Sequence, residues 1–269
     1  MAWNMWIICC GMVRAASTLQ YQLTSEIVEY KNMGKSIGWI EPNKFSYFQD
    51  KYHNYQGCLI AKCHKYIKEA VDLDRKENAK LIYSFRDIRD IYLSLINKNQ
   101  SKLSFWTIIQ QIESALSDYY SWNKLNNILS SKYEIFTKHL SQEVLRIANH
   151  IDIQLSPEEA RQISDKFTLA RQREKIASFD YNKLGVQVNE NTIYDPKSLL
   201  HENHIFLGES ELWKKEMTKL QLSIIEGVFY AWLVENDYPI SQNFFSRQYG
   251  AFLYYLHKIK FVDTIKVNG

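Results

Sequence analysis

A short segment near the start of the chain, directly after an apolar run, carries side chains suited to binding an anion. This segment, Gly11–Thr18, carries Arg14, Ser17 and Thr18. A guanidinium and two hydroxyls donate hydrogen bonds to oxyanions, and the N–H groups at a helix start add further donors. The segment therefore predicts a phosphate or sulfate site. The alternative is that Ser17 is a simple helix N-cap.

A second group of charged residues follows another apolar run. It consists of Arg86-Asp87-Ile88-Arg89-Asp90, with Ser94 one helical turn beyond Asp90. If Asp90 begins a helix, Ser94 faces back toward the helix N-terminus, and Arg86 and Ser94 can hold a further phosphate. Ligands in open α/β sheets bind at the carboxyl ends of strands, where both groups are expected. A surface cluster of ion pairs explains the same residues equally well.

Hydrophobic periodicity predicts the elements that position these residues. Buried strands are expected at Trp6–Cys10, Gly57–Lys62 and Lys80–Ser84, with a possible fourth at Lys132–Phe136, and helices from Ser17 and over Tyr66–Arg75, Asp90–Ile96 and residues 105–129. Strands that alternate with helices at this spacing indicate βαβ units and a parallel sheet covered on both faces.

The second half of the chain is predicted to be mainly helical. Helices are expected at Pro157–Lys166, Glu211–Asn236 and an aromatic-rich Phe244–Lys260. The last of these could cap a pocket or contact a membrane, and docking on its own domain is the expected arrangement. Residues 177–207 lack periodicity and are predicted to form a long functional loop.

Composition excludes several classes of protein. The 269 residues carry 33 Lys and Arg against 30 Asp and Glu, a net charge of +3, which disfavours a disordered tail or a nucleic-acid coat. The apolar run Met5–Val13 is too short to span a membrane, and no Lys or Arg precedes it, as a signal peptide would require. The four cysteines lack metal or redox spacing. We therefore expect reduced core thiols and a cytoplasmic protein.

The first segment departs from the phosphate loop of ATPases. That loop reads G-x-x-x-x-G-K-[ST], and its Lys clamps the β- and γ-phosphates. Here Ala16 replaces the second Gly, and Ser17 stands where the Lys should be. These differences argue against a kinase that acts on a nucleotide or small molecule, although a kinase remains the rival enzyme class.

The two predicted anion-binding segments, which lack that lysine, resemble the nucleotide-binding motifs of the sulfotransferases that use 3′-phosphoadenylyl sulfate (PAPS). In that family the pattern P-[KR]-[SA]-[GA]-[ST]-[TS] holds the 5′-phosphosulfate, and Val13–Thr18 matches it except for the leading Pro. The family's R-[DN]-x-[RK]-D-x-x-x-S binds the 3′-phosphate, and Arg86 through Ser94 matches it in full.

Later segments extend the resemblance over about residues 6–239. Tyr133-Glu134 is similar to a Y-E-D strand end whose Tyr lies near the nucleotide. Gly208–Lys214 is similar to a late G-x-x-G-x-W-K element, with Glu211 in place of the second Gly. Ala231-Trp232-Leu233 and Tyr238 resemble the closing W-L…Y segment.

The chain also departs from the family pattern. The Arg-Lys pair that often precedes the late Gly is replaced by Phe206 and Leu207, so that His204 or Lys214 substitutes for it or the nucleotide is held less tightly. Leu19 takes the place of a Trp that often stacks near adenine.

The resemblance implies an α/β fold that is P-loop-like, with a parallel sheet flanked by helices on both faces and a mainly helical C-terminal part. Residues 1–269 are expected to form one sulfotransferase domain, with a nucleotide-binding core over about 1–140 and a helical part over about 141–269 that completes the site. The implied nucleotide contacts are Arg14, Ala15, Ala16, Ser17, Thr18, Arg86, Ser94, Tyr133, Thr168, Gly208 and Lys214.

The chemical step is assigned by the similarity of Lys62-Cys63-His64 to the family's K-[TS]-H. His64 is the expected general base, because an imidazole titrates near working pH. Lys62 or Arg14 is expected to stabilise charge on the departing nucleotide, and no metal is required. His53 and Glu41 are lesser candidates for the base. A Cys63–His64 nucleophile pair is not expected, because neighbouring strand residues point to opposite faces.

The implied activity is transfer of a sulfuryl group from PAPS to a hydroxyl or amine of a small molecule, for which a specialised metabolite such as an alkaloid is the expected class. The compact chain suits a bacterial-type enzyme. No nucleic-acid partner and no membrane anchor are expected. The non-enzymatic alternative is a degenerate sulfotransferase-like domain that binds nucleotide as a sensor or scaffold.

Overall fold

The computed structural model describes residues 4–98, 102–125, 127–180, 186–189, 192–202, 204–205 and 208–267. The chain divides into two compact units. The sheet unit consists of Met1–Arg86 and Gln110–Gly208, and the helical unit consists of Asp87–Ile109 and Glu209–Gly269.

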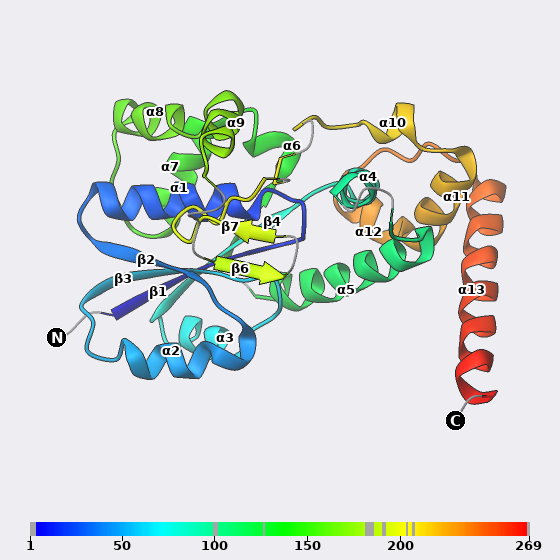
Figure 1. Ribbon diagram of the computed structural model, residues 1–269, viewed down its shortest axis with the longest axis horizontal. Helices are drawn as coiled ribbons and strands as arrows, with labels where there is room; N and C mark the ends of the chain where they lie inside the picture. Colours follow the sequence, from blue (N-terminus) through cyan, green and yellow to red (C-terminus); the bar gives the residue numbers. More distant parts are fainter. Residues whose placement is uncertain are drawn as a thin grey trace. The chain divides into compact units, whose positions relative to one another are not determined.

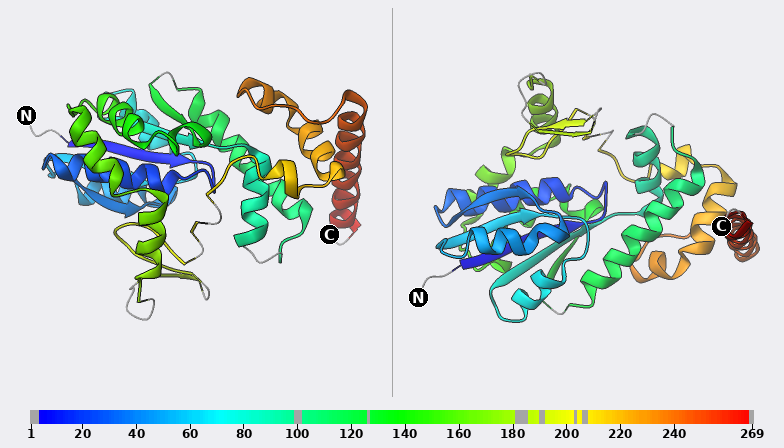
Figure 2. Two further views of the ribbon diagram at one scale, coloured as in Figure 1. Left: turned by 90° about the horizontal axis from the view of Figure 1, so that it is seen from above. Right: turned by 60° about the horizontal axis from the view of Figure 1, so that its bottom comes forward.

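The centre of the sheet unit is a five-stranded sheet in the order β2-β3-β1-β4-β5. The strands are β1 (Asn4–Gly11), β2 (Gly34–Trp39), β3 (Gly57–Lys62), β4 (Ala79–Phe85) and β5 (Ile128–Lys132). All four neighbouring pairs are parallel, and β1 runs through the middle, as two further views make clear (Figure 2). The carboxyl ends of all five strands therefore lie along one edge of the sheet.

Helices cover both faces of this sheet. On one face lie α1 (Ser17–Tyr30), α7 (Leu140–His150) and α8 (Pro157–Asp165), and on the other lie α2 (Phe45–Lys51) and α3 (Lys68–Asp74), with the short helix η1 (Pro42–Lys44) before α2 (Figure 1). Successive side chains of β1 point to opposite faces of the sheet, so this one strand packs against both layers of helices. Ile7 joins a core cluster with Leu23 of α1, whereas Trp6 packs against Phe45 of α2 with ring centroids 5.0 Å apart. The predicted fold class is confirmed.

Two predictions for the sheet unit are wrong in detail. The fourth strand was expected at Lys132–Phe136, but β5 ends at Lys132 and Tyr133–Phe136 is a helical turn, α6. As an edge strand, β5 accommodates polar Ser130 and Ser131, which hide its strand pattern. Residues 177–207, expected as a loop, contain the antiparallel pair β6 (Val186–Asn189) and β7 (Thr192–Tyr194), which follows α9 (Leu169–Ala177).

The helical unit is built from two segments of the chain. It contains α4 (Ile88–Lys98), the first turns of α5 (Phe105–Asn123), α10 (Trp213–Glu216), α11 (Lys219–Val228), α12 (Tyr230–Glu235) and α13 (Phe244–Val267). The single helix expected at Glu211–Asn236 is therefore three helices. A new helix starts at Thr218 because its hydroxyl accepts from the Gln221 N–H at 3.2 Å, in a reciprocal capping box.

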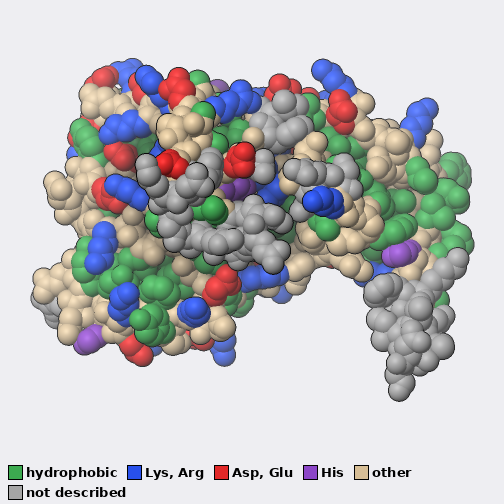
Figure 3. Space-filling model, viewed as in Figure 1, with side chains coloured by type: hydrophobic (Ala, Val, Ile, Leu, Met, Phe, Trp, Pro, Cys, Tyr) green, Lys and Arg blue, Asp and Glu red, His purple; other side chains and the backbone are tan. Residues whose placement is uncertain are grey.

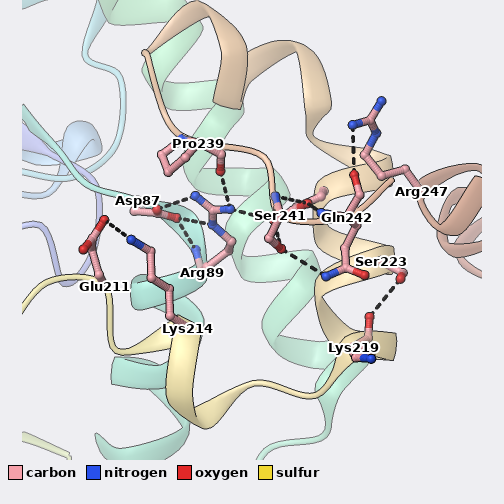
Figure 4. Close-up of polar contacts among 11 residues, drawn as sticks. Asp87, Arg89, Glu211, Lys214, Lys219, Ser223, Pro239, Ser241, Gln242 and Arg247 are labelled. Atoms are coloured by element: carbon pink, nitrogen blue, oxygen red, sulfur yellow. Dashed lines mark hydrogen bonds and ion pairs between the residues drawn. The ribbon is translucent and has the colours of Figure 1, made fainter. Parts of the chain in front are cut away.

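A buried arginine holds the two segments of the helical unit together. Arg89 donates to Asp87 through Nε and Nη2, at 2.9 and 2.7 Å, and to Glu226 and the Pro239 carbonyl through Nη1, both at 2.7 Å (Figure 4). Its guanidinium also stacks on Trp213, 3.6 Å from the ring centroid. Arg86, Asp87, Arg89 and Asp90 are all at most 6% exposed, so the alternative of a surface ion-pair cluster is wrong.

Glycines bring α11 and α13 into backbone contact. A Cβ on Gly250 would lie 2.1 Å from the Ser223 carbonyl oxygen, and one on Gly227 would lie 2.2 Å from that of Arg247. The expectation that the aromatic helix docks on its own domain therefore holds for one face of α13. Exposed aromatic residues occupy another face, where apolar side chains gather over this helix (Figure 3): Phe244, Phe245, Tyr249, Phe252 and Tyr255.

A search of the helices in the described ranges finds none that is long and apolar enough to cross a membrane.

Candidate active site at the carboxyl edge of the sheet

The loop after β1 forms a cradle of backbone groups, the Gly11–Ser17 loop. Gly11 lies directly against β4, since a Cβ there would come within 2.3 Å of Ser84 Oγ. Arg14 and Ala16 have left-handed backbones, with φ of 64° and 56°. Ala16, rather than Ser17, is the N-cap of α1, so the N-cap interpretation of Ser17 is wrong. Because alanine has no polar side chain to cap the helix, the first N–H groups of α1 are available to an anion in the loop.

Two further strand ends bring cationic and aromatic groups to this loop. Arg86, just after β4, donates from Nη1 to the Arg14 carbonyl oxygen at 3.2 Å. Its guanidinium lies 4.0 Å from the ring centroid of Tyr133, which follows β5. Burial and then the charge of Arg86 lower the pKa of Arg14 to about 10. A bound anion would relieve this repulsion, so the loop, Arg14 and Arg86 suit a polyanion.

The buried hydroxyl of Ser84 supports the same conclusion. Ser84 is fully buried, pairs with Gly11 in the β1–β4 register, and its Oγ has no hydrogen-bond partner among the described residues. Buried polar atoms normally have a partner, and an exception at a loop calls for an explanation. A ligand oxygen or a water in the Gly11–Ser17 loop would supply one.

Lys62 and His64 lie at the end of β3, next to the same loop. His64 Nδ1 is 2.7 Å from the Gly11 carbonyl oxygen, and His64 Nε2 is 3.4 Å from Lys62 Nζ. A carbonyl oxygen only accepts, so we assign the proton to Nδ1, which leaves the Nε2 lone pair toward the ammonium of Lys62. The arrangement places a proton acceptor and a buried cation side by side.

The loop that follows His64 is anchored to α5. Lys65 Nζ donates to Ser114 Oγ at 2.6 Å and to Asp118 Oδ2 at 3.0 Å, while the Tyr66 N–H donates to Asp118 Oδ1 at 3.1 Å. A salt bridge that also caps a backbone N–H restrains a loop more than a single ion pair does. Asp118 therefore holds the backbone next to His64, a role for which the sequence carries no signal.

The thiols take no part in this arrangement. Cys63 Sγ lies 3.7 Å from Cys10 Sγ, and all four cysteines are free and buried, as predicted. Burial raises the pKa of Cys9 to about 12, so this thiol stays protonated. The lesser candidates for the base have other hydrogen-bond partners, since His53 Nδ1 lies 2.6 Å from the Asp50 carbonyl oxygen and Glu41 accepts from Trp39.

Trp39 was missed because its strand was missed. The β2 segment, Gly34–Trp39, contains Lys35, Ser36 and two glycines and lacks the apolar run of the central strands. Its only sequence signal was Ile37 followed two residues later by Trp39, at the strand period. In the structure, the Trp39 ring centroid is 4.6 Å from Lys62 Nζ.

The remaining predicted nucleotide contacts fall in two places. In the sheet unit, the Thr168 hydroxyl caps α9 by accepting from the Arg171 N–H at 3.4 Å, and a Cβ on Gly208 would contact Leu169 at 3.0 Å. Ser94, buried on α4, and Lys214 of α10 belong to the helical unit. Lys214 Nζ pairs with Glu211 Oε1 at 2.6 Å. Phe206 and Leu207 lie outside the described residues.

Asp90 has a structural role that the sequence did not indicate. Its carboxylate accepts from the Glu211 N–H at 2.7 Å and from the Trp213 N–H at 3.2 Å. The second Asp of the Arg86–Ser94 segment therefore fixes the backbone of Glu211 and Trp213 to α4 inside the helical unit.

Comparison with known proteins places this chain in one family. A family model described as a sulfotransferase domain matches residues 17–237. The search of curated proteins returns no match.

Solved sulfotransferase structures have the same fold. A mouse sulfotransferase, SULT7A1, complexed with PAP has a TM-score of 0.63 at 14% identity, covering 88% of this chain and 86% of that one. Retinol dehydratase with retinol and PAP has a TM-score of 0.57 at 15% identity, with 90% and 86% coverage. Its complex with androsterone and the inactive cofactor PAP has a TM-score of 0.55 at 15% identity, with 90% and 85% coverage. Because the family model spans most of the sequence, the chain belongs to the sulfotransferase family.

Proposed function

We propose that this protein transfers the sulfuryl group of PAPS to a hydroxyl or amine of a small molecule, with His64 as general base. The observation that carries the proposal is the hydrogen bond between His64 Nδ1 and the Gly11 carbonyl oxygen, 2.7 Å long. It fixes a proton acceptor directly beside the loop that suits a phosphosulfate. Residues 1–269 are proposed to act as one sulfotransferase domain.

The donor is proposed to bind along the carboxyl edge of the sheet. Its 5′-phosphosulfate would be held by Arg14, Ala15, Ala16, Ser17 and Thr18 of the Gly11–Ser17 loop and first turn of α1, and its 3′-phosphate by Arg86 and Ser94. Tyr133, Thr168, Gly208 and Lys214 complete the proposed contacts. The buried Ser84 hydroxyl and the lowered pKa of Arg14 support an anion here. PAP is the nucleotide in the solved structures of similar fold.

The proposed reaction is an in-line displacement at sulfur. His64 Nε2 takes the proton of the acceptor, whose oxygen or nitrogen forms the new bond to sulfur. The bond from sulfur to the bridging oxygen breaks, and its electron pair leaves with the 5′-phosphate of PAP. Lys62, 3.4 Å from Nε2, or Arg14 neutralises the charge that develops on that oxygen. A general base contributes about 10²–10⁴-fold to such a step.

The acceptor is proposed to be small and not polyanionic. The net charge of +3 gives no sign of a surface adapted to sulfated glycans, and a specialised metabolite such as an alkaloid is the class we favour. Four free, buried cysteines are consistent with a reducing compartment, which supports the cytoplasm as the proposed location.

Two alternatives predict different ligands. A P-loop kinase would bind ATP with magnesium, but Ser17 stands where its phosphate-clamping lysine belongs. A degenerate scaffold would bind PAP without turnover.

Calorimetric titration with PAP, and separately with ATP and magnesium, tests the proposal. We expect micromolar PAP binding and no ATP binding, followed by PAP release from PAPS when hydroxyl and amine acceptors are screened. Binding of ATP but not PAP would replace the proposal with a kinase. Binding of PAP with no acceptor giving turnover would favour the scaffold.

A further inference from the structure

The end of β2 brings an aromatic side chain onto the Lys62–His64 pair. The indole of Trp39 lies beside both residues, with its ring centroid 4.6 Å from Lys62 Nζ and 5.1 Å from the His64 ring centroid. The Trp39–His64 contact is edge-on, with an angle of 64° between the ring planes. One indole therefore contacts the cation through its face and the imidazole at the same time.

A carboxylate fixes the orientation of this indole. Trp39 Nε1–H donates to Glu41 Oε1 at 2.6 Å, although both residues lie toward the surface. Trp39 is also held from its backbone, because β2 pairs with β3 and Trp39 lies opposite Lys62 in the register. An indole with its N–H tied down and its backbone in the sheet cannot turn without breaking one of these contacts.

The Lys62–His64 contact needs such support. At 3.4 Å from Nζ to Nε2 it is a long hydrogen bond, and the lysine side chain is flexible. An aromatic face attracts an ammonium, and this attraction strengthens where water is excluded, as it is for Lys62, which is 3% exposed.

We propose that Trp39, oriented by Glu41, is a positioning residue that holds Lys62 against His64 Nε2 and keeps the imidazole in its Nδ1–H tautomer. Before the donor and the acceptor bind, Lys62 then serves as the donor to Nε2, and the Gly11 carbonyl oxygen as the acceptor from Nδ1. In the proposed reaction Lys62 turns to the bridging oxygen, which leaves Nε2 to take the proton of the acceptor. The inference rests on the proposed role of His64, but its first test requires neither PAPS nor an acceptor.

Nitrogen-15 NMR of histidine-labelled protein, above the ordinary titration range of imidazole, reports the tautomer directly. His64 is assigned among the seven histidines by its loss in His64→Gln. In the parent protein we expect a protonated Nδ1 and an unprotonated Nε2. In Trp39→Leu and Glu41→Leu we expect both nitrogen shifts to move toward the average of the two tautomers.

Conservative variants separate positioning from folding. Glu41→Gln keeps an acceptor for the indole N–H and should retain the parental tautomer, whereas Trp39→Phe keeps an aromatic face but has no N–H for Glu41, so it should match Glu41→Leu. Melting temperatures identify any variant that fails to fold. A parental tautomer in folded Trp39→Leu, or a mixture of tautomers in the parent protein, would overturn the proposal.

If PAPS is turned over, a double-mutant cycle with Lys62→Met gives a second test, with p-nitrophenol as the acceptor probe. Trp39→Leu should lower kcat about 10–100-fold, the scale of a small misplacement of reacting groups, with KM for PAPS nearly unchanged. In the Lys62→Met background, Trp39→Leu should lower kcat no further. Additive losses would mean that Trp39 does not act through Lys62. Failure of PAP to bind, with the NMR result as expected, would remove the proposed function and leave the positioning role standing.

Discussion

The two nitrogens of His64 have different partners, and this difference predicts how single substitutions act. Nδ1 faces the Gly11 carbonyl oxygen at 2.7 Å, whereas Nε2 faces Lys62. Asn places its amide N–H close to where Nδ1–H lies, but it offers no basic nitrogen at the position of Nε2.

His64→Asn should therefore bind PAP with parental affinity and lose about 10²–10⁴-fold in turnover. Calorimetry and a PAP-release assay measure the two quantities separately. His53→Asn, at an exposed histidine, is the matched control and should leave both unchanged. Parental turnover in His64→Asn would remove this residue from the mechanism.

Substitution of Arg86 should change the affinity for PAP. Its guanidinium contacts the Arg14 carbonyl oxygen and stacks on Tyr133, so it is held in place before any ligand binds. Arg86→Ala should weaken PAP binding by about 1.5–3 kcal/mol, the range of a hydrogen bond to a charged group. Arg171→Ala, which removes an exposed arginine of α9, is the control and should bind PAP normally. Equal affinities of Arg86→Ala and the parent would contradict the 3′-phosphate assignment.

The sequence predicted Arg14 and Arg86 as neighbours because both follow buried strands, and parallel strands end along one edge. The family resemblance added Lys62 and His64 at the end of a third strand. The structure brings these four residues of the sheet unit to that edge. What the sequence could not predict is that Arg89 and Asp90, in the same short motif, serve the fold of the helical unit. A motif records residue types and spacing, whereas burial and partners depend on chain segments far away.

At the scale of elements, the central strands were predictable and the edge strands were not. β1, β3 and β4 are buried on both faces and read as apolar runs. β2 and β5 lie at the edges, where lysine and serine are tolerated, and their patterns are lost. Hydrophobic periodicity detects what a strand buries, so it fails where a strand buries little.

The contact between α11 and α13 predicts that a glycine-to-alanine substitution in α13 lowers the stability of the protein. Replacing glycine by alanine inside an exposed helix stabilises a protein by about 0.5–1 kcal/mol. At Gly250 the added Cβ would lie 2.1 Å from the Ser223 carbonyl oxygen, so the helices must separate. Gly250→Ala should therefore destabilise, by about 1–3 kcal/mol.

Thermal unfolding of Gly250→Ala beside Ser246→Ala, on the same helix, measures this effect. The Ser246 variant should stay within about 0.5 kcal/mol of the parent, as surface substitutions usually do. Stabilisation by Gly250→Ala would show that the two helices are not in backbone contact.

At the scale of the whole molecule, the buried network around Arg89 carries the stability of the helical unit. Glu226 is fully buried, and besides Arg89 it accepts from the backbone N–H groups of Ser241 and Gln242. Glu226→Ala leaves a buried guanidinium without one of its two carboxylates, a loss of about 3–5 kcal/mol. Glu174→Ala, which breaks an exposed ion pair with Arg171, should cost at most about 1 kcal/mol. Denaturant unfolding compares the two variants, and similar midpoints would contradict the role of the network.

Ligand binding should also be visible in the stability of the whole chain. A ligand that binds only the folded state at 100 times its Kd stabilises that state by about 2.7 kcal/mol. PAP at that concentration should therefore raise the melting temperature, whereas adenosine, which lacks both phosphates, should not. An equal shift with adenosine would mean that the Gly11–Ser17 loop and Arg86 contribute little.

The division of the helical unit between two stretches of sequence has a consequence for synthesis. Arg89 and Glu226, which pair at 2.7 Å, are 137 residues apart along the chain. Ribosomes add about 5–20 residues per second, so Arg89 is made about 7–27 s before its partner exists. During that interval β1, β3 and β4 are already complete, whereas α4 carries an arginine that cannot yet be buried. The helical unit can therefore be completed only late in translation. Until the segment that contains Glu226 has been made, Arg89 stays in contact with water.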